Sequence, residues 1–230
     1  MMDSIMADTI DSPVLFSMRL SLQVASVATL FIVVVGTAAA YLLARKNFRG
    51  KEAVDMLLTL PLVLPPTVTG YYLVIVFGRN GLIGKPVYEL TGWSIMFTWH
   101  AAVLASFVVA LPLMVKTSRA AIESIDKNII NASYTLGHAE LETAFRVVLP
   151  LAQRGIIAGA VLSFARAMGE FGATLMLAGN IPGKTDTVPL SIYSLAGSGE
   201  WPKANAMVLL FTAISGVFLY LANRYTRRAA

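Results

Sequence analysis

The amino-acid sequence predicts an all-α membrane protein built as one bundle of about five transmembrane helices. Apolar residues make up 57% of the 230 residues, and charged residues only 13%, whereas soluble domains carry roughly 25%. The mean hydropathy is +0.70. Since a span needs about 20 apolar residues, at most about six crossings fit. We therefore treat 1–230 as a single transmembrane domain with no separate soluble domain.

The first predicted span covers residues 15–43. The segment before it carries three aspartates and no basic residue, the opposite of a signal peptide, and the apolar run is too long for a cleaved one. Four basic residues then fall within 45–51. In a soluble protein such a cluster could bind nucleic acid. Directly after a span it is typical of a cytoplasmic anchor, so we expect no nucleic-acid partner.

The second predicted span, 54–77, contains several helix-breaking residues: Pro61, Pro65, Pro66 and Gly70. A proline removes a backbone donor, and the freed carbonyl must find another partner in a neighbouring helix or a water-lined cavity. Such an interrupted helix fits the wall of a transport pathway. It also fits a simple kink, and the sequence leaves both interpretations open.

The third predicted span is 95–115, with a break expected at Pro112. It follows a glycine-rich segment, 78–94, that we interpret as an external connection with one short interfacial helix. Trp93 marks the return of the chain to the membrane interface.

The fourth predicted span, 155–179, has the only acidic residue in the middle of any span. Gly155 and Gly159 form a small-residue packing face, while Arg166 and Glu170 are four residues apart and so share one helix face. An isolated charge at the membrane centre costs roughly 2.5–3.5 kcal/mol, so we expect the two to pair. The pair could fix helix packing or take part in gating.

The fifth predicted span is 204–221, and the Lys and Arg residues between spans indicate the orientation. One side has twelve: Arg45, Lys46, Arg49, Lys51, Lys116, Arg119, Lys127, Arg146, Arg154, Arg224, Arg227 and Arg228. The other side has four: Arg79, Lys85, Lys184 and Lys203. The positive-inside rule places the C-terminus in the cytoplasm and the N-terminus outside. The polar stretch 124–150 is then cytoplasmic.

Catalytic and cofactor motifs are weak. Residues 179–185 look like a phosphate-binding loop, but the first glycine is one residue too close and the segment follows an apolar helix rather than a strand. The chain has two histidines and no cysteine, so we predict no metal site and no enzyme activity. An intramembrane hydrolase using Glu170 as its base would lack an evident nucleophile.

The stretch 131–150, NASYTLGHAELETAFRVVLP, has a recognisable order of residues. Asn131, Ala132 and Ser133 precede Gly137, and Leu149-Pro150 follow. We expect Gly137 to end a short helix in the left-handed conformation and Pro150 to lie in the first turn of the next span. The order resembles the cytoplasmic "EAA" loop of ABC-importer membrane subunits, which docks on an ATPase. Asn131 stands where that pattern has Glu, so it lacks the charge for a salt bridge to the ATPase.

A wider resemblance covers nearly the whole chain. Its segments are 60–70 (LPLVLPPTVTG), 111–115 (LPLMV), 164–174 (FARAMGEFGAT) and 180–185 (NIPGKT). These are similar to the membrane subunits of molybdate ABC importers, in a family that also includes tungstate and sulfate permeases. The run from Arg166 to Thr174 is the most specific part.

The resemblance implies a type I ABC-importer permease in the inner membrane, surrounded by lipid. It implies a homodimer, two ATPase subunits that hold ATP and magnesium, and an extracytoplasmic molybdate-binding protein, with no cofactor on this chain. Tungstate or sulfate stays open as the cargo, because few fixed charges in the spans could select an oxyanion. A self-contained channel or exchanger is the alternative from another class.

Overall fold

The computed structural model describes residues 12–228, and every element in that range is helical. The helices are α2 (Ser12–Arg45), α3 (Lys51–Val63), α4 (Pro66–Phe77), α5 (Gly84–Thr91), α6 (Trp99–Glu123), α7 (Lys127–Thr135), α8 (Glu140–Thr143), the π-helix η1 (Ala144–Val148), α9 (Leu149–Met168), α10 (Gly172–Ala178), α11 (Val188–Gly197) and α12 (Trp201–Arg228). The prediction of an all-α bundle is confirmed.

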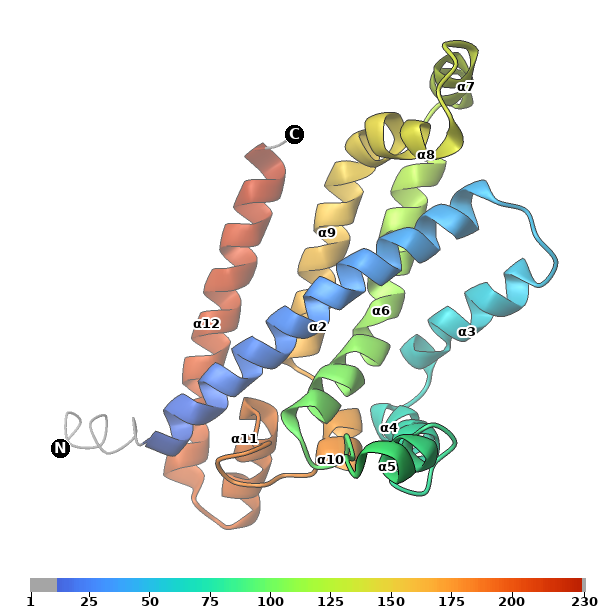
Figure 1. The fold of residues 1–230 in the computed structure, drawn as a ribbon. Helices are drawn as coiled ribbons and strands as arrows, with labels where there is room; N and C mark the ends of the chain where they lie inside the picture. Colours follow the sequence, from blue (N-terminus) through green and yellow to red (C-terminus); the bar gives the residue numbers. More distant parts are fainter. Residues whose placement is uncertain (1–11, 229–230) are drawn as a thin grey trace.

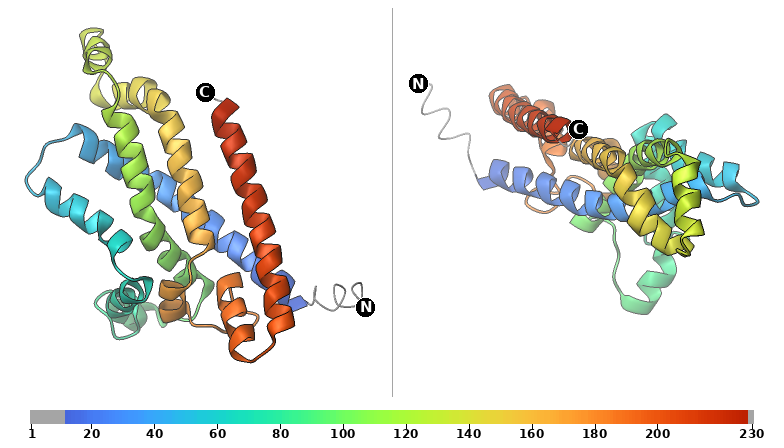
Figure 2. Two further views of the ribbon diagram at one scale, coloured as in Figure 1. Left: turned by 180° about the vertical axis from the view of Figure 1, so that it is seen from behind. Right: turned by 90° about the horizontal axis from the view of Figure 1, so that it is seen from above.

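Four helical segments within the described residues are long and apolar enough to cross a membrane: Pro13–Arg45, Trp99–Glu123, Glu140–Met168 and Trp201–Ala222. Figure 1 shows α6, α9 and α12 running up and down beside one another, with α2 crossing α6 and α9 diagonally. The helices α7 and α8 project at the end where α12 finishes, and α4, α5, α10 and α11 gather at the opposite end (Figures 1 and 2).

The core lies where α2, α6 and α9 pack together. Its centre holds fully buried side chains such as Ile32, Met114 and Val115. The predicted small-residue face of α9 is confirmed, since a Cβ at Gly155 would lie 2.3 Å from the Ala121 Cβ and one at Gly159 would lie 2.3 Å from the Thr117 Oγ1. These glycines allow α9 to approach α6 closely.

The second predicted span is two helices rather than one. Helix α3 ends at Val63, Leu64 is extended, and α4 begins at Pro66. Pro65 has no N–H for a helical bond, and a proline disfavours the helical conformation of the residue before it. The consecutive prolines therefore separate the span into halves, and Pro61 is accommodated inside α3.

The break expected at Pro112 was wrong. Helix α6 continues without interruption from Trp99 to Glu123, with Pro112 buried inside it. Neighbouring helices hold this region, and the Ser163 hydroxyl of α9 donates to the Ala110 carbonyl over 3.3 Å. Side chains from packed helices can thus support the backbone around a membrane proline.

The start of the fourth span was also placed too late. Helical structure begins at Glu140 and passes through η1 into α9, and Pro150 lies in the first turn of α9, as predicted. The wider π-helical turn directly before it includes a Leu149 N–H bond to the Ala144 carbonyl. Such a turn fits a proline, which cannot donate the next helical bond.

The end of that span was placed too far along the chain. Helix α9 finishes at Met168, residues 169–171 are not helical, and the short α10 follows. Glu170 therefore lies at a break between two helices rather than in the middle of one. Gly169 lies in the break and Gly172 begins α10, and glycine weakens a helix interior.

Candidate functional site

The projecting hairpin, which we define as residues 126–148, contains the predicted coupling motif. The Asp126 carboxylate caps α7 by accepting from the Asn128 N–H at 2.8 Å. At the other end of α7, Gly137 has φ +87°, and the His138 N–H donates to the Ser133 carbonyl at 3.3 Å. The predicted left-handed turn at Gly137 is confirmed, and it reverses the chain toward α8.

A polar network inside the hairpin holds its two arms together. The Ser133 hydroxyl lies 2.9 Å from the Thr143 hydroxyl and 3.1 Å from the His138 Nδ1. Ser133 and Thr143 are both buried, whereas Asn131 and Ala132 are exposed. Of the three small residues in the motif, Ser133 thus stabilises the turn and the other two lie on the surface.

Large apolar side chains cover the outside of the hairpin. Leu136, Leu141 and Phe145 have exposed fractions of 78%, 73% and 69%. Polar or charged residues lie next to each of them in the sequence, and an exposed apolar cluster with a polar rim is typical of a protein interaction surface. The sequence analysis missed them, although large apolar residues next to polar and charged ones were the available signal.

The hairpin joins the bundle through one small core and an ion pair. The core consists of buried Ile130 and Val148 with Ala40, Ile122 and Ala152. At the surface, the Lys46 Nζ lies 2.5 Å from the Glu140 Oε2, and this hydrogen bond raises the pKa of the Lys46 ammonium. Leu149 is half-buried and Pro150 exposed at the start of α9.

At the opposite end, the two interrupted spans meet at their breaks, and we call this region the paired breaks (residues 64–70 and 166–176). A Cβ on Gly70 would lie 2.8 Å from the Ala173 Cα, and a Cβ on Gly172 would lie 2.9 Å from the Pro66 Cβ. Helices α4 and α10 thus pack almost backbone to backbone. The structure brings together Pro65, Pro66 and Gly70 with the segment that holds Arg166 and Glu170.

The Glu170 side chain connects the two sides of the α9–α10 break. Its Oε1 accepts from the Ala173 N–H at 2.8 Å and so caps α10, while its Oε2 lies 2.8 Å from the Arg166 Nη1. The predicted ion pair is therefore present. The Glu170 side chain is 1% exposed and that of Arg166 is 32% exposed, so the guanidinium faces out from a buried carboxylate.

Comparison with known proteins identifies the family. Residues 20–230 match the model of the inner-membrane component of binding-protein-dependent transport systems. The chain belongs to this family. It is therefore a multi-pass inner-membrane permease subunit and not an enzyme.

Sequence alignments with related permeases extend over most of this chain. The molybdenum transport system permease protein ModB of Haemophilus influenzae is 43% identical over 209 residues, which is 91% of each chain. ModB of Escherichia coli K12 is 47% identical over 76% of this chain and 77% of its own. ModB of Azotobacter vinelandii is 39% identical over 92% and 95%.

Solved structures share the fold at lower identity. A bacterial ABC transporter that imports alginate matches with a TM-score of 0.78 at 16% identity, covering 95% of this permease and 80% of that chain. The MetNI methionine ABC transporter in an inward-facing conformation matches with 0.73 at 17% identity, covering 96% and 100%. The permease thus has the fold of ABC-importer membrane subunits.

Proposed function

We propose that this permease is the membrane subunit of an ATP-driven importer that moves molybdate across the inner membrane. The observation that best supports this proposal is the sequence identity of 39–47% to three ModB permeases over most of the chain. Tungstate or sulfate is the alternative cargo. A homodimer with two ATPase subunits and an extracytoplasmic molybdate-binding protein completes the transporter, and ATP and magnesium are held by the ATPases.

The hairpin end of the bundle faces the cytoplasm in this proposal. The loop after α2, the hairpin and the end of α12 lie together at that end (Figure 1), and they carry most of the basic residues between spans. The excess of Lys and Arg favours a cytoplasmic location. The N-terminus is then outside and the C-terminus inside.

The hairpin is the surface that docks on the ATPase. Leu136, Leu141 and Phe145 supply apolar area for burial, which stabilises an interface in rough proportion to the area removed from water. Asn131 and Ala132 add exposed small groups near the same turn. Because the Ser133 network makes the hairpin a rigid unit, a displacement of the ATPase moves the hairpin and α9 together.

The paired breaks form part of the pathway wall. Discontinuous membrane helices expose helix termini and backbone groups to a pathway, and the N-terminal ends of half-helices favour anions. Helix α4 begins here, and Arg166, near the end of α9, is partly exposed. Pro65, Pro66 and Gly70 shape the break, and Glu170 holds the Arg166 guanidinium in place.

Molybdate uptake tests both the cargo and the docking surface. The chain is expressed with its ATPase and binding protein in cells without a molybdate importer. Molybdate uptake is then measured in the presence of excess tungstate or sulfate as competitor. We expect excess tungstate to inhibit molybdate uptake as strongly as added molybdate does, because these two oxyanions are alike in size. We expect excess sulfate not to inhibit it. Sulfate uptake alone would overturn the assignment.

The variant Leu141→Asp tests docking in the same cells. The side chain is already exposed, so the protein should reach the membrane in normal amounts, while uptake falls at least tenfold because a charge is placed in an apolar interface. Ser124→Asp adds a charge to an exposed residue at the end of α6, outside the hairpin, and should leave uptake within twofold. Equal uptake by the two variants would remove the hairpin as the docking surface.

A further inference from the structure

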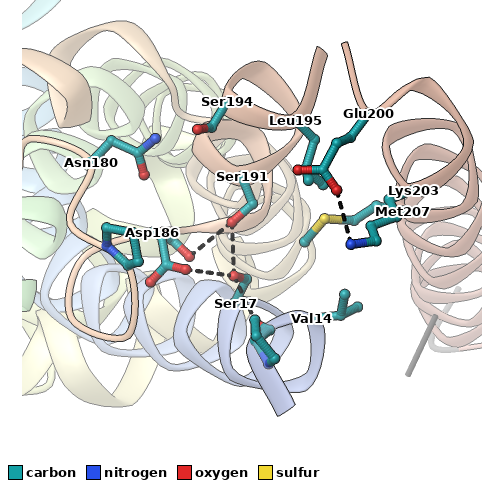
Figure 3. A pocket seen from close by; sticks show the side chains of 12 residues that line it. Val14, Ser17, Asn180, Asp186, Ser191, Ser194, Leu195, Glu200, Lys203 and Met207 are labelled. Carbon is teal, nitrogen blue, oxygen red and sulfur yellow. Dashed lines mark hydrogen bonds and ion pairs between the residues drawn. The ribbon is translucent and has the colours of Figure 1, made fainter. Parts of the chain in front are cut away.

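At the end of the bundle opposite the hairpin, a cavity of about 230 Å³ lies between α2, the loop after α10, α11 and α12. Its charged side chains already have partners within the chain (Figure 3). The Lys203 ammonium lies 2.8 Å from the Glu200 Oε2. The Asp186 carboxylate accepts from the Ser17 hydroxyl at 3.2 Å and from backbone amides of its own loop. Among these described side chains, no charge remains for a ligand to balance.

The loop between α2 and α3 differs, because its positive charge is not balanced within the described chain. We define the basic loop as residues 45–51, and its cations are Arg45, Lys46, Arg49 and Lys51. Lys46 pairs with Glu140 of the hairpin. The other three cations form no ion pair with any described residue.

Nearby acids leave most of this charge in place. Glu52, at the start of α3, is exposed and offsets one of the three unpaired cations, which leaves a net charge of +2. Asp55, one turn further along α3, is already engaged by α6. Its carboxylate lies 3.2 Å from the Lys116 Nζ and 2.9 Å from the Arg119 Nη1. Asp55 therefore does not compensate the basic loop.

The basic loop is a defined turn that presents an aromatic side chain with its cations. Gly50 has φ +87°, and the Lys51 N–H donates to the Phe48 carbonyl at 3.2 Å. The Lys51 ammonium donates to the Asn47 Oδ1 at 3.4 Å. Phe48 is exposed, and it lines the same open hollow as Lys51. An apolar ring and a positive charge thus lie side by side on the surface.

Apolar side chains on both sides of the basic loop indicate that it lies at the membrane surface. Leu42, in the last turn of α2, is exposed, and so are Met56 and Leu57 in the first half of α3. A membrane helix can expose such side chains to lipid, whereas Arg and Lys are costly in the hydrocarbon. The chain therefore leaves the apolar layer at the end of α2 and re-enters it along α3, with the cations at headgroup level.

We propose that the basic loop binds anionic phospholipids, with Arg45, Arg49 and Lys51 attracting the phosphate headgroups and Phe48 inserted between the lipids. Cations next to a membrane span favour anionic lipids, and each contributes about fivefold in affinity. An aromatic ring adds apolar burial at the headgroup boundary. The inference does not depend on the cargo, since it requires only that α2 crosses the membrane. Because Lys46 joins the loop to Glu140, bound lipid also holds the hairpin near the membrane surface.

The test places a reporter beside the basic loop. The chain has no cysteine, and Ala53 is exposed and lines the hollow next to Phe48. A polarity-sensitive fluorophore on Ala53→Cys is followed in the full-length permease, in nanodiscs of phosphatidylcholine with increasing phosphatidylglycerol. We expect a blue shift in emission that saturates with phosphatidylglycerol. It should weaken from about 0.1 M to about 1 M NaCl, as the screening length falls from about 10 Å to about 3 Å. Unchanged emission at every phosphatidylglycerol fraction would overturn the proposal.

Neutralising the three cations should remove the response. The variant Arg45→Gln/Arg49→Gln/Lys51→Gln should bind phosphatidylglycerol about a hundredfold more weakly, because each cation contributes about fivefold. The single variant Arg49→Gln keeps the test decisive if the triple variant does not fold, and it should lose about fivefold. The matched control is Lys184→Gln, which removes one exposed cation at the opposite end of the bundle and should respond within twofold of the parent. Equal responses of Arg49→Gln and Lys184→Gln would overturn the proposal.

Two further additions distinguish a lipid from other partners of a basic surface. Inorganic phosphate added to nanodiscs of pure phosphatidylcholine should leave the emission unchanged. A blue shift with phosphate alone would assign the loop to a soluble anion instead. The ATPase subunit added to the same nanodiscs should also leave the emission unchanged. If the ATPase shifts the emission and phosphatidylglycerol does not, the basic loop belongs to the docking surface and the lipid assignment is wrong.

Discussion

The hairpin and the paired breaks are built in opposite ways. The hairpin has its polar groups bonded inside and its large apolar side chains outside, with Leu141 and Phe145 mostly exposed. At the paired breaks, backbones of two interrupted helices touch through Gly70 and Gly172, and a buried carboxylate joins the fragments. The hairpin therefore tolerates changes on its surface, whereas the breaks depend on exact packing.

This difference fits the two roles proposed above, docking for the hairpin and part of the pathway wall for the paired breaks. A docking element must keep its shape while its apolar surface is exposed in the absence of the partner. Internal hydrogen bonds can hold that shape without a large core. A break in a membrane helix instead leaves backbone groups that need partners within the protein, since lipid offers none. Substitutions should thus reduce stability strongly at the breaks and weakly at the hairpin.

The largest expected effect comes from separating the ion pair at the breaks. Arg166→Gln leaves the Glu170 carboxylate buried without its counter-charge, so we expect a loss of about 3 kcal/mol in the free energy of unfolding. Glu170→Gln should cost less, about 1 kcal/mol, because Arg166 is 32% exposed and water can solvate it. Both are measured by thermal and denaturant unfolding in nanodiscs.

The double variant provides the control for this pair. Removing both charges relieves the unpaired carboxylate, so Arg166→Gln/Glu170→Gln should be more stable than Arg166→Gln alone. If stability and molybdate uptake both recover, the pair serves packing. If only stability recovers, the pair takes part in transport. Strictly additive losses would show that the two side chains do not interact.

An intermediate effect is expected from closing the space between α4 and α10. The Cβ of Gly172→Ala would lie 2.9 Å from the Pro66 Cβ and 3.1 Å from the Thr67 nitrogen, so one backbone must move, at about 1–3 kcal/mol. Gly197→Ala in α11 meets no atom within 4 Å and should leave the melting temperature unchanged or slightly higher. Equal stability of the two variants would show that the close packing does not matter.

The sequence predicted the elements that depend on local chemistry. The long apolar runs became helices, Gly137 adopted the left-handed turn, and the four-residue spacing of Arg166 and Glu170 gave an ion pair. Each follows from hydrophobic length, backbone freedom or helical spacing, which short segments contain.

Other features depended on contacts between distant segments and could not be predicted in this way. Pro112 remained helical because neighbouring helices enclose it, while the prolines at 65 and 66 divided their span. The meeting of Gly70 with Ala173 joins residues a hundred positions apart. The cavity around Asp186 requires α2, α11 and α12 to converge, and no local pattern encodes that convergence.

The smallest expected effect is on the polar network of the hairpin, and it should stay local. Ser133→Ala removes the hydroxyl that contacts Thr143 and His138, leaving the buried Thr143 hydroxyl without this partner. A lost hydrogen bond of this kind costs about 0.5–1.5 kcal/mol. Because the hairpin joins the bundle through a small core, the global melting temperature should change little, while amide hydrogen exchange in residues 126–143 should increase several-fold.

Thr135→Ala is the matched control on the same hairpin. The Thr135 hydroxyl is exposed and donates only to the Ala132 carbonyl within its own helix, at 2.8 Å, so water can replace that bond when it is removed. Hydrogen exchange should then remain within about twofold of the wild type, since surface substitutions usually change stability by less than 0.5 kcal/mol. Faster exchange spreading through α9 to the paired breaks in Ser133→Ala would contradict the comparison, because it would show that the two regions unfold as one unit.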